Sequence, residues 1–518
     1  MYYFLNQYIK ALNSSVEHAE FHRLALFKHE RLTTKIVTRD FDPMEHLNAA
    51  NFGLAQDDIL NMYDYFQDTV KVKENSTSVK KLNIPISYQL KYDSNVSKAY
   101  QGGRLAQTIH HTPGRVGEVA SVEHYDEFGN IANRELWDSR GFHTASQLLD
   151  YDGAPHAEIL YHLDGTRAVE RFWEITDDRK GKVIFSIHLI NYKGNDYYFN
   201  SEDDLFTFFL DEINRQTKTE DTFIADRPGI TDIPLVNMKT RAKKYLFFPI
   251  LHAANPEDLI NSELEPSYAE VFKHLDKLDG LITMTEDQAR QLRIRLKRLK
   301  GKGRNIKITA IPGVAFSNQE LKKPQILMNS RPGKKVLYAG RLGVDKGVDN
   351  LIRAFALVTP QVPDATLDIR GFGDQDFVQS LENLIKQLNL QDNVTISGYT
   401  SNIEPVYDSA KIFASAAHQD AFPLAMAEAL AHGLPLVAFD TNFGPSRIIK
   451  DGVNGYLLAP GDLYGYAQDI ISLLTNDKML QRMSVNSYES AKDYEFKNVW
   501  KQWRNALNLK SKRKASTK

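Results

Sequence analysis

The stretch that most constrains the fold lies between residues 336 and 440. Residues 336–339 are a short apolar run, which leads into the glycine-rich loop 340–347 and then into a helical pattern of apolar residues. A strand that ends in such a loop before a helix is where parallel α/β sheets bind anions, because free N–H groups and the helix dipole point there. Arg341 and Lys346 add two positive charges to this loop. We therefore predict a phosphate-binding α/β domain.

A second strand-to-helix junction follows about seventy residues later in the same stretch. The apolar run 411–415 precedes Asp420, and Glu428 lies two turns along a helix that starts near Pro423. Two carboxylates and two cations at one sheet edge suit a ligand with both phosphates and hydroxyls, such as a nucleotide sugar. Glycosidases also use paired carboxylates, but they do not need the two cations.

Five motifs between residues 340 and 457 carry a family resemblance. In order they are Gly-Arg-Leu-x3-Lys-Gly, Gly-Phe-Gly, Gly-Tyr-Thr, acid-x7-Glu-Ala and Asn-Gly-Tyr-Leu. Together they resemble the donor-binding domain of family 4 retaining glycosyltransferases. The resemblance implies the α/β GT-B fold, in which two Rossmann-like domains face a cleft. One departure is Asp420, because the family usually has Glu there, and the shorter side chain changes its contact.

The resemblance also implies roles for individual residues. Arg341 and Lys346 would hold the donor diphosphate, Asp420 the sugar hydroxyls, and His252 would reach the transferred sugar; these four form the expected catalytic set. A lone His at a strand exit is otherwise more often structural. The expected donor-binding residues are Ser14, Ser15, Gly340, Gly371, Tyr399, Phe422, Pro423, Leu424, Ala425 and Glu428. Ser14 also fits an ordinary helix N-cap. We expect neither a metal nor a cofactor, since the two cations supply the charge that a metal would bring.

Composition limits the class of protein and its expected location in the cell. The chain has 518 residues, a formal net charge of −2 and no Cys. This balance does not indicate nucleic-acid binding, and the absence of Cys excludes disulfides and thiolate catalysis. The N-terminus lacks a signal-peptide pattern, and no apolar run is long enough to span a membrane. We expect a cytoplasmic protein that at most contacts the inner face of the cell membrane.

The pattern of apolar and polar residues changes between residues 76 and 198. Alternating apolar and polar residues are interrupted by turns such as Tyr151-Asp152-Gly153 and Leu163-Asp164-Gly165, at the spacing of successive hairpins. This pattern predicts an antiparallel β-meander. The predicted units are an N-terminal domain of residues 1–75 and 199–321 with the meander 76–198 inserted, a C-terminal nucleotide-sugar domain 322–495, a helix 496–509 that crosses back, and a disordered basic tail 510–518. Residues 322–335 are the expected interdomain linker.

Such an insertion is what the resemblance implies for two bacterial subgroups. These are the transferases of serine-rich or Ser-Asp-repeat adhesins and the α-glycosyltransferases of poly(glycerol- or ribitol-phosphate) teichoic acid. The edge strands of a sheet have unpaired backbone groups, which can bind another chain. We expect the meander to mediate a homo-oligomer or hetero-complex, or to dock the acceptor; a passive structural elaboration is the alternative.

Residues 290–304 contain eight cations and no acid. A polyanionic acceptor or an anionic membrane surface would explain this density, and a solubilising helix face is the alternative. The candidate acceptor or membrane contacts are Arg290, Arg293, Lys297 and Arg304.

These features together predict an enzyme. It would move a hexose or N-acetylhexosamine, glucose or GlcNAc, from a UDP-sugar to a bacterial surface acceptor with retention of configuration. Ser or Thr of a serine-rich protein is the favoured acceptor, and wall teichoic acid is the alternative. A non-catalytic acceptor-binding partner would belong to another class, but such partners typically lose the donor cations that Arg341 and Lys346 represent here.

Overall fold

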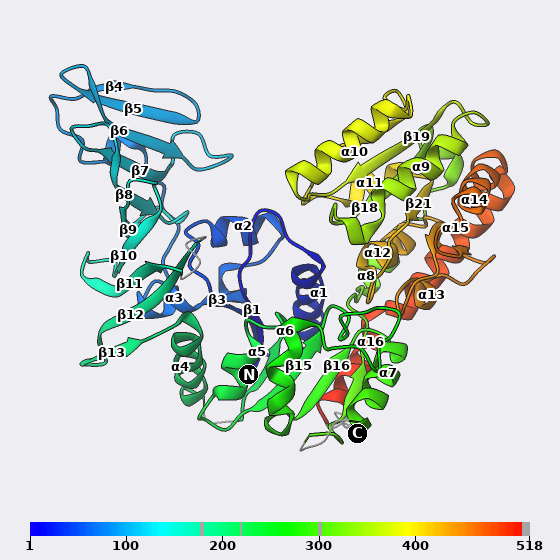
Figure 1. The fold of residues 1–518 in the computed structure, drawn as a ribbon, viewed down its shortest axis with the longest axis horizontal. Coiled ribbons are helices and arrows are strands. Elements are labelled where there is room, and N and C mark those ends of the chain that lie inside the picture. The colour runs from blue at the N-terminus through cyan, green and yellow to red at the C-terminus, as the bar shows by residue number, and fades with distance from the viewer. Residues whose placement is uncertain (177–180, 218–219, 299–302, 510–518) are drawn as a thin grey trace, which may run out of the picture.

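The computed structural model describes residues 1–176, 181–217, 220–298 and 303–509. Three sheets organise these residues, two of them parallel and one antiparallel. Figure 1 shows a U-shaped molecule in which the N-terminal domain forms the base. The inserted antiparallel sheet rises on one side of it and the C-terminal domain on the other. The predicted tail 510–518 lies outside the described residues.

The N-terminal domain is built on a seven-stranded parallel sheet of order β17-β16-β15-β14-β1-β2-β3. Its strands are β1 (Tyr2–Asn6), β2 (Thr34–Thr38), β3 (Ile59–Asn61), β14 (Thr222–Ala225), β15 (Lys243–Phe248), β16 (Gly280–Thr283) and β17 (Ile308–Ala310). Its helices are α1 (Ser15–His29), α2 (Glu45–Asn51), α3 (Met62–Phe66), α4 (Glu202–Arg215), α5 (Asp232–Asn237), α6 (Pro266–Ala269) and α7 (Glu286–Arg298). The strands are nearly continuous apolar runs because helices cover both faces of the sheet. The strand order reverses between β1 and β14, which places a crevice at their carboxyl ends.

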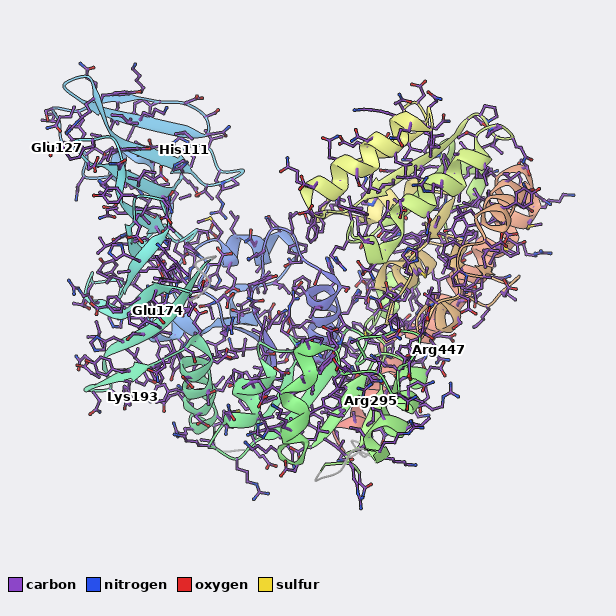
Figure 2. The ribbon with its side chains drawn as sticks, viewed as in Figure 1. His111, Glu127, Glu174, Lys193, Arg295 and Arg447 are labelled. Atoms are coloured by element: carbon purple, nitrogen blue, oxygen red, sulfur yellow. The ribbon has the colours of Figure 1, made fainter. Side chains whose placement is uncertain are left out.

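The inserted sheet has ten antiparallel strands in sequential order from β4 to β13. They are β4 (Gln89–Lys91), β5 (Val96–Gln101), β6 (Arg104–His111), β7 (Val119–Tyr125), β8 (Ile131–Trp137), β9 (His143–Leu149), β10 (Pro155–Tyr161), β11 (Arg167–Ile175), β12 (Lys182–Tyr192) and β13 (Asn195–Phe199). Its inner half shares a core with the N-terminal domain, in which Leu160 and Ile187 pack with Phe206 of α4. His111 and Glu127 lie at the outer end of the sheet, whereas Lys193 lies near its base (Figure 2).

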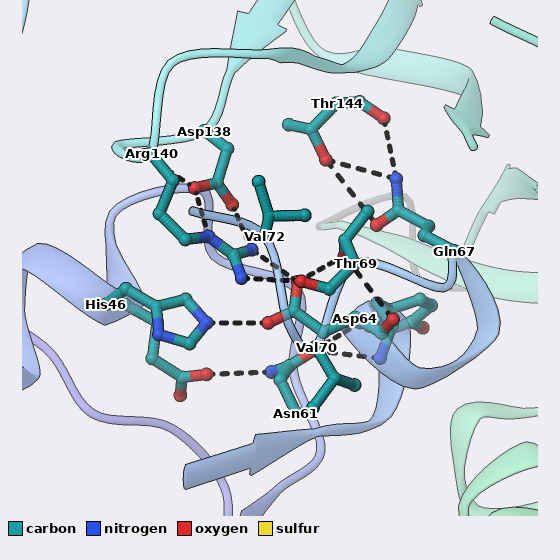
Figure 3. Close-up of polar contacts among 12 residues, drawn as sticks. His46, Asn61, Asp64, Gln67, Thr69, Val70, Val72, Asp138, Arg140 and Thr144 are labelled. Atoms are coloured by element: carbon teal, nitrogen blue, oxygen red, sulfur yellow. Dashed lines mark hydrogen bonds and ion pairs between the residues drawn. The ribbon is translucent and has the colours of Figure 1, made fainter. Parts of the chain in front are cut away.

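A buried polar cluster fixes this sheet to the N-terminal domain (Figure 3). Arg140, in the turn between β8 and β9, is 3% exposed and donates to Asp64 Oδ1 at 2.7 Å, to Asp138 Oδ1 at 2.8 Å and to the Thr69 carbonyl at 2.8 Å. His46 Nε2 lies 2.6 Å from the other oxygen of Asp64. Burial alone would raise the pKa of Asp64, but His46 and Arg140 lower it to about 2. The insertion is therefore held by charged hydrogen bonds as well as by apolar packing.

The C-terminal domain contains a six-stranded parallel sheet of order β20-β19-β18-β21-β22-β23. Its strands are β18 (Lys334–Ala339), β19 (Ala365–Arg370), β20 (Val394–Ile396), β21 (Ile412–Ser415), β22 (Leu436–Phe439) and β23 (Gly455–Leu458). Its helices are α8 (Asn318–Leu321), α9 (Val348–Val358), α10 (Gln375–Gln387), α11 (Glu404–Ser409), α12 (Leu424–Ala431), α13 (Pro445–Ile448), α14 (Leu463–Thr475) and α15 (Asp477–Ala491). The order reverses between β18 and β21, so the two predicted loops meet at this domain's switch point.

The chain passes between the two domains earlier than residues 322–335, where the linker is predicted. Ile326 N donates to the Tyr488 hydroxyl at 3.0 Å and Met328 N to Gln481 Oε1 at 2.8 Å, so this segment already packs on the C-terminal domain. The crossing segment is residues 311–317, which pair at Phe316 with Glu495. Proline content suggested the later position, but those prolines lie in a segment that is held by side chains.

The last helix, α16 (Phe496–Ala506), packs on the N-terminal domain. Its Trp500 and Trp503 rings both meet Phe27 of α1 edge-on, with ring centroids 5.3 Å apart in each pair. The chain therefore crosses between the domains twice, at residues 311–317 and again before α16.

Candidate active site

The loop after β18 is shaped by close backbone contacts. Gly347 has φ +57°, and a Cβ there would lie 2.0 Å from the Ala416 carbonyl oxygen. At Gly371 a Cβ would lie 1.8 Å from the Gly340 carbonyl oxygen. Glycine is required at both positions because the loops after β18, β19 and β21 touch through their main chains. The predicted glycines thus bring three loops together at the switch point.

The two predicted cations face acids in this loop cluster. Lys346 Nζ lies 2.8 Å from Asp420 Oδ2 and 3.4 Å from the Gln419 carbonyl oxygen. Arg341 Nη2 contacts both oxygens of Asp345, at 2.9 and 2.8 Å, and its side chain is half-exposed. Cations held at the mouth of a strand-loop-helix junction can bind an incoming phosphate. An open pocket of about 560 Å³ borders Arg341 and is also lined by Phe372 and Phe377.

Helix α12 begins at the same switch point with Pro423 as its N-cap. The first N–H groups of a helix have no partner within it, so the backbone of Leu424 and Ala425 can receive an anion. The side chain of Phe422 instead packs against Tyr494, with ring centroids 5.9 Å apart. Only the backbone of Phe422 is therefore available to a ligand in this arrangement.

Glu428, on α12, is held from two directions. Its Oε2 accepts from the Tyr407 hydroxyl at 2.9 Å, and its Oε1 lies 3.4 Å from His22 Nε2 of α1. Burial alone would raise the pKa of Glu428, but His22 and Tyr407 lower it to about 2. The carboxylate is ionised at neutral pH and can accept hydrogen bonds from ligand hydroxyls.

A second histidine of α1 also meets the C-terminal domain. His18 Nε2 lies 3.3 Å from the Tyr399 hydroxyl, and the Tyr399 ring lies edge-on to Phe372. Burial raises the pKa of Tyr399 to about 12 and lowers the pKa of His18. Two of the predicted donor-binding residues, Tyr399 and Glu428, are thus contacted from the other domain.

His252 follows β15 and is fully buried. Its Nε2 donates to the Leu259 carbonyl at 3.1 Å, so Nδ1 carries the lone pair and has no partner among the described residues. Burial lowers the pKa of His252 to about 4, and the imidazole is neutral. Its ring stacks with Phe443 of the C-terminal domain, with centroids 6.4 Å apart. His252 can accept a hydrogen bond at Nδ1, but it is not a cation.

Ser14 caps α1 in the way an ordinary N-cap does. Its Oγ accepts from Val16 N and its backbone N–H donates to Glu17 Oε2 at 2.8 Å, which completes a capping box. Glu17 also forms an ion pair with Arg227, which follows β14. The Ser14 hydroxyl is therefore committed to the helix start, and only the loop backbone near Ser14 and Ser15 is left to contact a donor.

The cations of α7 are largely engaged. Arg290 pairs with Asp287 at 2.8 Å and Arg293 with Glu286 at 2.6 Å, and both acids lie just before the window that looked acid-free. Arg295, labelled in Figure 2, is buried and donates to two backbone carbonyls. Lys297 and Arg304 are exposed. Helix α7 packs on β17 at the base of the U, as α16 does (Figure 1).

Several residues near the site were not predicted from the sequence. Each of them touches a residue that was predicted. They are His18, His22, Asp345, Tyr338 and Tyr407. The Tyr338 hydroxyl donates to the Arg341 carbonyl at 2.9 Å and so shapes the cationic loop. The spacing of His18 and His22 places them on one face of α1, which was the available signal. Asp345 adjoins Lys346 in the loop itself.

Within the described part of the chain, no group of three or more His, Asp or Glu side chains is placed to hold a metal ion. The described helices include none that is long and apolar enough to cross a membrane.

Comparison with known proteins identifies a family domain in the C-terminal part of this chain. Residues 319–490 match the family model for glycosyl transferases group 1. The pneumococcal O-GlcNAc transferase GtfA, solved with UDP and GlcNAc, superposes with a TM-score of 0.84 at 21% identity over 98% of both chains. The chain is a glycosyltransferase with the GT-B fold. The resemblance and the fold predicted from the sequence are therefore confirmed.

Two relatives share sequence over most of this glycosyltransferase. It is 25% identical to the UDP-N-acetylglucosamine–peptide N-acetylglucosaminyltransferase GtfA subunit of Streptococcus gordonii over 98% of both chains. It is 24% identical to the poly(glycerol-phosphate) alpha-glucosyltransferase of Bacillus subtilis, over 87% of this chain and 65% of that protein. The staphylococcal protein TarM also has this architecture, with a TM-score of 0.79 at 19% identity over 98% of both chains.

Proposed function

We propose that this glycosyltransferase moves GlcNAc or glucose from a UDP-sugar to Ser or Thr of a serine-rich surface protein, with retention of configuration. The observation that carries the proposal is the pairing of Lys346 with Asp420 beside Arg341, at the switch point of a group 1 domain. A bound diphosphate would replace Asp420 as the partner of Lys346 and Asp345 as the partner of Arg341. A protein acceptor is supported by the streptococcal relative, which is a peptide N-acetylglucosaminyltransferase and aligns over 98% of both chains.

The donor would bind in parts across the two domains. Glu428 would accept the ribose hydroxyls, Asp420 the sugar hydroxyls, and the N-terminus of α12 a phosphate. The cations would act most strongly as the sugar–phosphate bond breaks, because negative charge then grows on the leaving diphosphate in a water-poor site. His252 would accept a hydrogen bond from a sugar hydroxyl at Nδ1, which its depressed pKa keeps unprotonated.

The bond changes balance without a covalent enzyme intermediate. The bond between the anomeric carbon and the β-phosphate oxygen breaks, and the acceptor hydroxyl oxygen attacks on the same face. The departing phosphate takes the hydroxyl proton. Lys346 and Arg341 supply charge at the leaving group throughout, so the step needs no metal in this proposal.

Teichoic acid is the second candidate acceptor. It is supported by the Bacillus relative and by the exposed cations Lys297 and Arg304. The ion pairs of Arg290 and Arg293 reduce the charge that α7 can offer to a polyanion. This engagement favours the protein acceptor.

We also propose that the inserted sheet binds a partner chain. Its terminal strands β4 and β13 leave unpaired edges, and Tyr198 on β13 is 69% exposed. The structure of a GtfA/B complex superposes on this chain with a TM-score of 0.74 at 23% identity over 98% of this chain. The partner for this chain could be a second copy or a different protein; size-exclusion chromatography with light scattering separates the two.

The test pairs each donor with each acceptor. The purified protein is incubated with UDP-GlcNAc or UDP-glucose and either a serine-rich peptide or a polyol-phosphate oligomer, and the acceptor is weighed by mass spectrometry. We expect the peptide to gain one sugar from one of the two donors. A gain on the polyol phosphate alone would replace the acceptor assignment, and no UDP release with any pair would refute the proposed activity.

A further inference from the structure

Helix α1 brings His22 against both the crossing segment and the donor domain. His22 Nδ1 lies 3.0 Å from the Ala315 carbonyl oxygen, and Nε2 lies 3.4 Å from Glu428 Oε1. Neither acceptor has a hydrogen to give, since one is a carbonyl and the other an ionised carboxylate. An imidazole that bonds to both must carry a proton on each nitrogen. Both contacts are hydrogen bonds only when the ring is an imidazolium.

The surrounding charges support the same state. Titratable groups act on His22 from three elements: His18 on its own helix α1, Glu320 on α8 and Glu428 on α12, which Tyr407 on α11 contacts in turn. Burial alone would lower the pKa of His22, but the hydrogen bond and charge of Glu428 outweigh it and raise that pKa above its ordinary value. Glu428 itself is ionised down to about pH 2, so its negative charge faces His22 throughout the range in which the imidazole titrates.

The contact fixes the direction of the Glu428 carboxylate. Tyr407 holds Oε2 from within the C-terminal domain, and His22 holds Oε1 from the N-terminal domain. A carboxylate oxygen has a second lone pair after accepting one hydrogen bond, so both oxygens can still accept from a diol. His22 is about one-fifth exposed, and its ring also packs edge-on against Phe316 of the crossing segment. Its place is thus fixed by the segment that joins the two domains.

We propose that His22 is a positioning residue for the donor, which holds Glu428 oriented and ionised for the ribose diol of a nucleoside diphosphate. The donor site is then complete only when α1 touches α12. The affinity for the nucleotide therefore depends on how the two domains are placed relative to each other. The inference rests on the proposed function, because it assigns Glu428 to the ribose. It adds a residue of the opposite domain to the donor site.

UDP affinity measured by calorimetry across pH 6 to 9 tests the proposal in the full-length protein, with pH values chosen around the ordinary His pKa of about 6.5. The wild type should bind more weakly as the pH rises through the raised pKa of His22, since the imidazolium is lost. His22→Gln should bind about tenfold more weakly at low pH, as expected for a hydrogen bond to a charged group, and should be flat across this range. The matched control is His29→Gln, which lies on the last turn of the same helix against Phe496 and should behave as the wild type.

A deoxynucleotide separates positioning from a general loss of structure. 2′-Deoxy-UDP should bind the wild type more weakly than UDP, and this penalty should shrink in His22→Gln because Glu428 is already misdirected. In a Glu428→Gln background, His22→Gln should add little, as coupled residues do in a double-mutant cycle.

Three results would overturn the proposal. They are an unchanged UDP affinity in His22→Gln, a tighter affinity, which would make His22 a competitor for Glu428, and additive losses in the double variant. If the wild type binds no UDP at all, the proposed function fails as well. Normal UDP binding together with any of the three results refutes only the role of His22.

Discussion

Replacing Arg140 by Met should loosen the inserted sheet from the N-terminal domain. Arg140 is 3% exposed and joins Asp64, Asp138 and the Thr69 carbonyl, so its loss leaves the buried Asp138 without a cation, while Asp64 keeps only its contact with His46. Removing one partner of a buried ion pair costs about 3–5 kcal/mol. Met keeps most of the aliphatic volume, which limits the loss to the charge and its hydrogen bonds.

Arg134→Met is the matched control on the same sheet. Arg134 pairs with Glu123 at 3.0 Å, but its side chain is 27% exposed and its hydrogen bonds go to Glu123 and Gln147 of the same sheet. Partly exposed pairs contribute about 0–1 kcal/mol. Urea unfolding of the full chain gives the free energy of unfolding, and hydrogen exchange gives the protection of residues 62–69 and 138–145. Both quantities should fall strongly in Arg140→Met and only slightly in Arg134→Met. Equal losses would refute the idea that this cluster anchors the sheet.

The pH dependence of the anchor has a definite sign. The pKa of Asp64 is lowered to about 2, so its contribution to stability is present above its ordinary value near 3.8 and is lost as the pH falls through about 2. In Arg140→Met the pKa of Asp64 should rise, and acid unfolding should begin at a higher pH than in the wild type. Acid titration followed by tryptophan fluorescence measures this shift. An unshifted acid midpoint would contradict the assigned pair.

Three further substitutions test other parts of the account. Gly347→Ala should weaken UDP binding while the fold is retained, because its Cβ would lie 2.0 Å from the Ala416 carbonyl oxygen; unchanged UDP affinity would count against the loop's role. Trp503→Ala should cost about 3–5 kcal/mol in thermal unfolding because this ring is 2% exposed, and a loss below ~1 kcal/mol would show that α16 does not hold the N-terminal domain. Asp420→Asn should lower kcat while UDP affinity is kept or increased, since Lys346 loses its partner; a large loss of UDP affinity would place Asp420 on the nucleotide instead.

Local sequence patterns were sufficient for the donor domain and for the existence of the inserted sheet. A strand, a glycine-rich loop and a helix occupy neighbouring residues, so Arg341 and Lys346 could be placed at a sheet edge from order alone. The Asp-Gly turns between residues 125 and 166 likewise marked successive hairpins. These signals are local, and tertiary packing did not override them.

Contacts between distant segments could not be predicted in this way. His22 and Glu428 are 406 residues apart, and nothing in the apolar pattern of α1 shows which of its faces meets the other domain. The positive charge that residues 290–304 can offer to a ligand was also overestimated from the sequence. Glu286 and Asp287 lie just before this segment and pair with its arginines. Arg295 is satisfied by backbone carbonyls from another loop, which no charge count can show.

The most direct test of the central claim is UDP release from the donor sugar by Lys346→Ala. Lys386→Ala, an exposed lysine on α10 of the same domain, is the control. If Lys346 stabilises the departing diphosphate, UDP release should fall to background in Lys346→Ala while UDP still binds, more weakly, and the control should retain wild-type turnover. Wild-type turnover in Lys346→Ala would contradict the assignment of this loop as the site of leaving-group stabilisation.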